Sequence, residues 1–133
     1  MNVNAKAADF VFQTVTDFPT SVSFYRDTLG LEVETLDEES GWAEFALPPT
    51  TLGIGKENPQ IPTTPGEGGT VIAMAVDDVE SATEELQDEG VTILMESVET
   101  GVCHMSMITD PDDHPIILHK RNDGTQGRVD PFP

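Results

Sequence analysis

Two copies of one pattern divide this sequence, and the repeat constrains the fold more than any other feature. In each copy an Asp follows an apolar segment, and a Gly follows an amphipathic stretch. These residues are Asp17 and Gly30 in the first copy, and Asp78 and Gly90 in the second. The Asp residues are 61 positions apart and the Gly residues 60. Because a half of this size buries too little surface alone, we expect both copies to pack into one domain.

Each copy is predicted to contain a strand, a helix and three further strands. An Asp just before Phe18 and Pro19 is typical of a helix start, because the carboxylate caps free N–H groups and Pro fits the first turn. A Gly after the apolar periodicity is typical of a helix end, and alternating apolar residues predict strands. The expected helices are 18–29 and the stretch between Asp78 and Gly90, and the expected strands are 10–16, 31–36, 41–47, 51–55, 70–76, 91–95, 102–108 and 115–119.

The repeat also sets the domain organisation. We expect a single domain over residues 1–133, of the α+β class, made of tandem βαβββ units. Its parts are a first half at 9–55, a linker rich in Pro, Gly and Thr at 56–69, a second half at 70–121, and a polar tail at 122–133.

The charge of the chain restricts its partners and its surroundings. The sequence has 25 acidic and six basic residues, a net charge of −19, and the acids are spread along the whole length. Such a surface repels nucleic acid phosphates and anionic membranes, so neither is expected as a partner. Because roughly molar salt would screen the repulsion among carboxylates, we infer a halophilic protein. An acidic face for a basic partner is the alternative.

Cysteine usage and the N-terminal segment indicate the compartment. Cys103 is the only cysteine and cannot form an internal disulfide, and residues 1–6 lack the apolar run of a secretory signal. The longest apolar run, residues 71–76, is far shorter than a membrane span. We expect a cytoplasmic protein.

Two motifs in the right order carry a resemblance to a known family. Ser23-Phe-Tyr-Arg-Asp-Thr-Leu-Gly30 lies in the first helix, and Asp110-Pro-Asp-Asp-His-Pro-Ile-Ile-Leu-His119 lies near the end of the second copy. Together with the tandem βαβββ units, they resemble the vicinal oxygen chelate superfamily of glyoxalases, bleomycin resistance proteins and extradiol dioxygenases. The resemblance implies a cupped, mixed eight-stranded sheet with two outer helices, a small-molecule cavity and a homodimer. It also implies a divalent metal held by His and Glu or Gln on the concave face.

The sequence departs from that family at the metal-binding positions. By alignment, the positions of the usual ligands hold Phe10, Val71 and Ile117, and only Glu44 is retained. One carboxylate among apolar side chains cannot offset the dehydration of a divalent cation. We therefore expect no metal and no other cofactor. A relocated divalent metal is the alternative.

Strand alternation predicts what lines the cavity instead. The residues expected to share the concave face are mostly aromatic or sulfur-containing, which suits an apolar or planar ligand. The candidate ligand-binding residues are Phe10, Phe12, Trp42, Glu44, Cys103, Met105, Met107 and His119. The alternative is that these side chains merely fill the cup as core.

Four residues need separate interpretations. Glu44 and His119 are the candidate catalytic residues, since a carboxylate in an aromatic cup can act as a base or pair with a cation. The alternative for Glu44 is a solvated position at the rim, and the alternative for His119 is a surface role beside Lys120 and Arg121. Cys103 is interpreted as a small buried hydrophobe, although a pair with His119 across the hairpin is conceivable. His114 is expected to be solvated in the turn.

Two function classes follow from these residues. The first is a binding protein that sequesters a small organic molecule, which the resemblance to bleomycin resistance proteins supports. The second is a lyase, isomerase or dioxygenase-like enzyme that uses Glu44 and His119, with or without a divalent metal. Fold alone does not decide between them.

Overall fold

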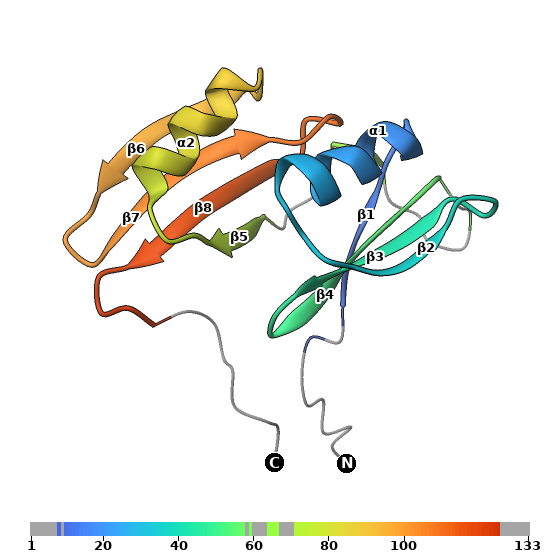
Figure 1. Ribbon diagram of the computed structural model, residues 1–133, viewed down its shortest axis with the longest axis horizontal. Coiled ribbons are helices and arrows are strands. Elements are labelled where there is room, and N and C mark those ends of the chain that lie inside the picture. The colour runs from blue at the N-terminus through green and yellow to red at the C-terminus, as the bar shows by residue number, and fades with distance from the viewer. Residues whose placement is uncertain (1–7, 9, 58, 60–63, 67–70, 126–133) are drawn as a thin grey trace, which may run out of the picture.

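Both predicted βαβββ units are present in the computed structural model, which describes residues 8, 10–57, 59, 64–66 and 71–125 (Figure 1). The first unit contains β1 (Val11–Thr14), α1 (Phe18–Ser23), a π-helical turn η1 (Phe24–Thr28), β2 (Val33–Asp37), β3 (Trp42–Leu47) and β4 (Thr50–Gly55). The second contains β5 (Ile72–Ala75), α2 (Val79–Asp88), β6 (Ile93–Glu99), β7 (Cys103–Thr109) and β8 (Pro115–Arg121). The α+β class and the element order are confirmed.

The residues that mark the repeat play the same role in both units. Asp17 accepts a hydrogen bond from the Thr20 N–H at 3.1 Å, and Asp78 accepts one from the Ser81 N–H at 2.9 Å. Each carboxylate therefore caps the first turn of its helix. Gly30 and Gly90 have φ angles of 75° and 89°, the left-handed conformation that ends a helix.

The first helix differs from its prediction in its second part. Residues 18–29 were expected to form one regular helix, but η1 follows α1 directly and is wider, with the Leu29 N–H bonded to the Phe24 carbonyl at 2.9 Å. The π turn still brings Phe24 and Tyr25 into the core. Hydrophobic periodicity does not distinguish a 3.6-residue turn from one slightly wider turn.

The eight strands form two mixed four-stranded sheets. Their orders are β1-β4-β3-β2 and β5-β8-β7-β6, with β1 parallel to β4, β5 parallel to β8 and all other pairs antiparallel. In the described residues, hydrogen bonds therefore make two sheets of four strands, with β1 and β5 at edges. Each sheet carries its own unit's helix on one face (Figure 1).

The core lies between each sheet and its helix. Side chains alternate along β3: Ala43 and Phe45 are buried on the helical side, while Trp42 and Glu44 on the other face are half-buried. Buried residues of both halves belong to one apolar cluster. The opposite face of each sheet is thus left for other roles.

Parts of the predicted linker and tail lie outside the described residues, namely 58, 60–63, 67–69 and 126–133. Within the described part of the chain, neither helix is long and apolar enough to cross a bilayer.

Candidate functional site

A pair of stacked aromatic rings lies on the face of the first sheet opposite α1. The Phe12 ring of β1 and the Trp42 ring of β3 have centroids 4.9 Å apart and planes inclined by 17°. Both side chains are half-buried. This Phe12–Trp42 platform presents a flat apolar surface with a polar N–H at one edge, which suits a second planar ring system.

Glycines on β4 make room for the platform. A Cβ at Gly55 would lie 3.1 Å from two atoms of the Phe12 ring and 3.2 Å from the Trp42 ring. At Gly53 the nearest Phe12 atom would be 3.4 Å from such a Cβ, an ordinary contact. Gly55 therefore lets both rings pack closely against β4, and Gly53 is less demanding.

Glu44 supplies the charge of this site. Its Oε1 accepts a hydrogen bond from the Trp42 indole N–H at 3.0 Å. The bond fixes the carboxylate at the edge of the platform and leaves its second oxygen for another donor. The arrangement matches a planar ligand that carries an N–H or a cationic group.

The candidates of the second half share one face of the second sheet. Met105 pairs with His119 and Met107 with Ile117 across β7 and β8, and all four side chains are half-buried. They point away from α2, because Ser106 between the two methionines contacts Thr83 of that helix at 2.8 Å. This face is rich in thioether groups, as the alternation predicted.

Cys103 lies on the same face but is 9% exposed and lies opposite Arg121 in the strand register. Its Sγ is 3.2 Å from Thr100 Oγ1. The thiol thus has a polar neighbour on its own loop, which fits the interpretation as a small buried residue.

The structure brings together only part of the predicted set. Trp42 contacts Phe12 through the stack and Glu44 through the indole hydrogen bond. Phe10 precedes β1 and is 49% exposed. Among the described residues, no hydrogen bond, ion pair or ring contact joins the platform to the methionine-rich face.

The donor chemistry of the platform does not match a divalent cation. Glu44 is a single carboxylate beside aromatic rings, and Ile117 lies on the apolar face of β8. In the described ranges, no three His, Cys, Asp or Glu side chains gather closely enough to hold one metal ion.

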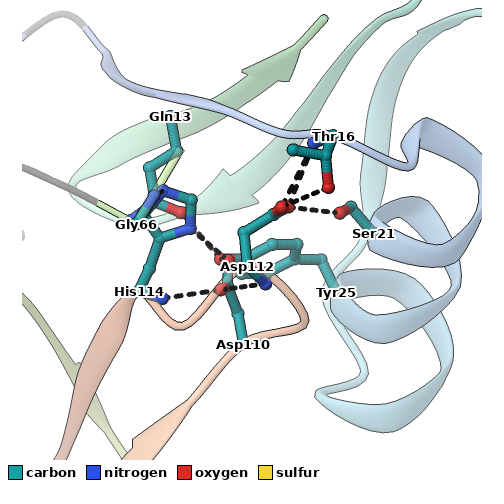
Figure 2. Close-up of polar contacts among 8 residues, drawn as sticks. All are labelled: Gln13, Thr16, Ser21, Tyr25, Gly66, Asp110, Asp112 and His114. Atoms are coloured by element: carbon teal, nitrogen blue, oxygen red, sulfur yellow. Dashed lines mark hydrogen bonds and ion pairs between the residues drawn. The ribbon is translucent and has the colours of Figure 1, made fainter. Parts of the chain in front are cut away.

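Sequence reasoning missed a polar cluster that joins the two halves, the inter-half clasp of Gln13, Thr16, Ser21, Tyr25, Gly66, Asp110, Asp112 and His114 (Figure 2). Tyr25 Oη lies 2.7 Å from Asp110 Oδ2 and 2.7 Å from Gln13 Oε1. Asp110 Oδ1 accepts from the backbone N–H groups of Asp112 and His114, both at 2.9 Å. A buried carboxylate of the second half is thereby satisfied partly by the first.

His114 is not solvated, so its prediction is wrong. It is 7% exposed, its Nδ1 lies 2.7 Å from Asp110 Oδ2, and its Nε2 accepts the Gly66 N–H at 2.9 Å. Since Nε2 accepts, Nδ1 carries the proton and donates to Asp110. His114 is buried because its turn contacts the first half and Gly66 of the linker, and a local motif cannot reveal such contacts.

Asp112 makes the second part of the clasp. Its carboxylate accepts from the Thr16 backbone N–H, with both oxygens at 3.2 Å, and from the Thr16 hydroxyl. The Ser21 hydroxyl is 3.5 Å from Oδ2. The loop between β7 and β8 therefore holds the start of α1 in place (Figure 2).

Titration of the clasp follows from its burial. Desolvation is the largest influence on Tyr25 and, with the adjacent Asp110 charge, raises the pKa of the phenol well above its ordinary value. Desolvation also opposes ionisation of Asp110, but hydrogen bonds from His114 and Tyr25 outweigh it and lower the pKa of that carboxyl. The clasp thus consists of a neutral phenol and an ionised carboxylate at neutral pH.

Comparisons with known proteins fit this architecture. The model of the Glyoxalase/Bleomycin resistance protein/Dioxygenase superfamily matches residues 7–118. No protein of curated function matches the sequence significantly.

Several solved structures are similar in fold. A glyoxalase/bleomycin resistance protein from Streptomyces sp. CB03234 is 26% identical, with a TM-score of 0.65, and the match covers 84% of this chain and 99% of that one. TnmS3, an antibiotic binding protein from the same Streptomyces, is 23% identical, with a TM-score of 0.73 and coverage of 91% and 100%. A glyoxalase/bleomycin resistance protein/dioxygenase from Nocardioides is 16% identical, with a TM-score of 0.71 and coverage of 97% and 93%.

Proposed function

Because this chain belongs to the Glyoxalase/Bleomycin resistance protein/Dioxygenase superfamily, we propose that it binds a planar, largely apolar small molecule on the Phe12–Trp42 platform. In this proposal the protein sequesters its ligand and does not transform it. Glu44 recognises an N–H or cationic group on the ligand.

The single observation that supports the proposal is the stacked pair beside a positioned carboxylate. The ring centroids are 4.9 Å apart, both side chains are half-buried, and both rings pack closely against Gly55. A core aromatic pair would be covered on all sides, whereas these rings keep accessible surface for a ligand. Stacking on such a surface contributes roughly 0.5–1.5 kcal/mol beyond the burial of apolar area.

The comparison with TnmS3 agrees with a binding role. That protein is described as antibiotic binding, and its fold resembles this one over most of both chains. At 23% identity the likeness concerns the fold, so the choice of ligand rests on this chain's own residues.

The donor set also supports binding without a resident metal. The platform offers one carboxylate, already bonded to Trp42 Nε1, and two aromatic rings. A divalent cation needs several oxygen or nitrogen donors. Stoichiometric Ni, Zn, Mn or Fe that survives dialysis of the purified protein would contradict this part of the proposal.

The test is calorimetric titration with 9-aminoacridine, a planar aromatic cation, and with acridine at a pH where it is neutral. Both titrations use about 2 M KCl, which screens non-specific attraction to the acidic surface. We expect Trp42→Ala to weaken binding of both probes by about tenfold or more, since it removes the stacking surface. Glu44→Gln should weaken only the cation, by a few-fold.

A matched control is Phe24→Leu, because Phe24 is a buried aromatic residue of η1 whose ring contacts Tyr25 and not the platform. It should leave the affinity for both probes unchanged once folding is verified by circular dichroism. Equal loss in Phe24→Leu and Trp42→Ala, or no binding by the wild type, would contradict the proposal.

A further inference from the structure

A cavity lies at the junction of the two halves, separate from the platform. Its volume is about 300 Å³. Leu31 and Leu47 of the first half contribute to its walls, and Met74, Leu86 and Leu118 contribute from the second. We call it the seam cavity. None of the platform residues lines it, and three of the residues that line it, Met74, Leu86 and Leu118, belong to the buried core.

The edge of the seam cavity is acidic. Glu85 and Glu89 line it, and both are exposed at the C-terminal end of α2. The last turn of α2 contains no basic residue, so nothing on the helix offsets the negative end of its dipole. No Lys, Arg or His of the described residues lines the cavity.

Walls and edge together select one class of ligand. Leucine and methionine side chains gain from contact with hydrocarbon, but they offer nothing to a hydrated metal ion. The carboxylates and the helix end repel an anion and attract a cation. A neutral hydrocarbon would gain from the walls but not from the edge.

We infer that the seam cavity binds a small amphipathic cation, an ammonium group on an apolar aliphatic or aryl body. The body lies among the leucines, and the ammonium group stays near Glu85 and Glu89. Because both halves supply walls, an occupant contacts both and stabilises the folded chain by mass action.

The test uses three probes of similar size: phenethylammonium, neutral 2-phenylethanol and anionic phenylacetate. In calorimetric titration at about 0.1 M KCl, phenethylammonium should bind most tightly and phenylacetate most weakly. At about 2 M KCl the difference in affinity between phenethylammonium and 2-phenylethanol should become smaller. No binding of phenethylammonium by the wild type, or binding no tighter than that of 2-phenylethanol, overturns the inference.

Two double variants separate the local carboxylates from general acidity. Glu85→Gln with Glu89→Gln should weaken phenethylammonium about five- to tenfold at low salt and leave 2-phenylethanol unchanged. Glu80→Gln with Glu84→Gln removes the same charge from the same helix but outside the cavity, and should change affinity less than twofold. Equal losses in both pairs overturn the inference.

Two further variants locate the binding. Leu47→Trp fills the cavity and should abolish binding of phenethylammonium and 2-phenylethanol. If that protein does not fold, Ala82→Leu fills the cavity from a half-buried position on α2 and should weaken both probes. Trp42→Ala should retain full binding, so this result is independent of the platform. Loss of binding in Trp42→Ala, or full binding in a folded filled variant, overturns the inference.

Discussion

The Phe12 ring lies against a strand position that only glycine occupies without moving the ring. Gly55→Ala places a Cβ 3.1 Å from that ring, so we expect it to lower the free energy of unfolding by about 1–3 kcal/mol. It should also change the near-ultraviolet dichroism of the displaced Trp42. Gly53→Ala is the matched control, with its contact at 3.4 Å, and should be close to neutral. Equal effects of the two substitutions would show that the Phe12 ring does not pack closely against Gly55.

The clasp predicts a pH dependence at residue scale. Tyr25→Phe removes a buried hydrogen bond to a carboxylate and should cost about 1.5–3 kcal/mol at neutral pH. The pKa of Asp110 is lowered in the fold, so its contribution is present above the ordinary value of about 3.9 and is lost as pH falls below it. The pKa of Tyr25 is raised, so its contribution is present below about pH 10 and is lost as pH rises further.

The measurement is the difference in the free energy of unfolding between the wild type and Tyr25→Phe, determined by urea unfolding at a series of pH values. We expect a constant difference between about pH 4 and pH 10, and a smaller one on either side. Using the difference cancels the titration of the surface acids. A difference that grows below pH 4 would contradict an ionised Asp110.

Some residue roles were predictable and some were not. Alternation along single strands placed Phe12, Trp42 and Glu44 on one face, because period two is a local property. Tyr25 and Asp110 are 85 positions apart, so no local pattern relates them. The sequence marked both only as parts of two motifs, and the shared burial that pairs them follows from packing of the halves.

At the scale of elements, the contribution of Asp78, which caps α2, can be compared with that of its neighbour Asp77. Asp78→Ala should cost about 1 kcal/mol, because it leaves the Ser81 N–H without its carboxylate acceptor. That hydrogen bond also lowers the pKa of Asp78, so the cost should shrink as pH falls below the ordinary carboxyl pKa of about 3.9 and the side chain is protonated. Asp77→Ala removes the same charge one position earlier and should be nearly neutral. Denaturant unfolding of the two variants checks this, and equal costs would contradict a capping role.

The type of each element could be predicted from local chemistry, but the pairing of strands within the sheets could not. As predicted, each helix begins after its capping Asp and is followed by a glycine with positive φ. The helix predicted over residues 18–29 differs from the structure in the π turn of η1. The division into two hydrogen-bonded sheets depends on which strands pair, and in the described residues neither β1 nor β5 pairs with a strand of the other half. The pattern within a single strand does not contain that pairing.

At the scale of the whole molecule, a net charge of −19 predicts strong salt dependence. Raising KCl from about 0.1 to 2 M should increase the free energy of unfolding by about 2 kcal/mol or more, since each screened like-charge pair is worth about 0.2–0.5 kcal/mol. A variant with six exposed glutamates changed to glutamine should show a much smaller increase. The six are Glu32, Glu39, Glu57, Glu84, Glu96 and Glu99. Equal stability of the wild type at both salt concentrations would contradict salt adaptation.

The homodimer that the family resemblance implies stays a prediction.

The central claim is that a planar ligand stacks on the Phe12–Trp42 platform. Trp42 is the only tryptophan in the chain, so its fluorescence reports on that surface alone. Titration with 9-aminoacridine in about 2 M KCl, corrected for absorption by the probe, should quench Trp42 emission saturably, with the dissociation constant found by calorimetry. Calorimetric binding with unchanged Trp42 emission would place the ligand elsewhere and contradict the account.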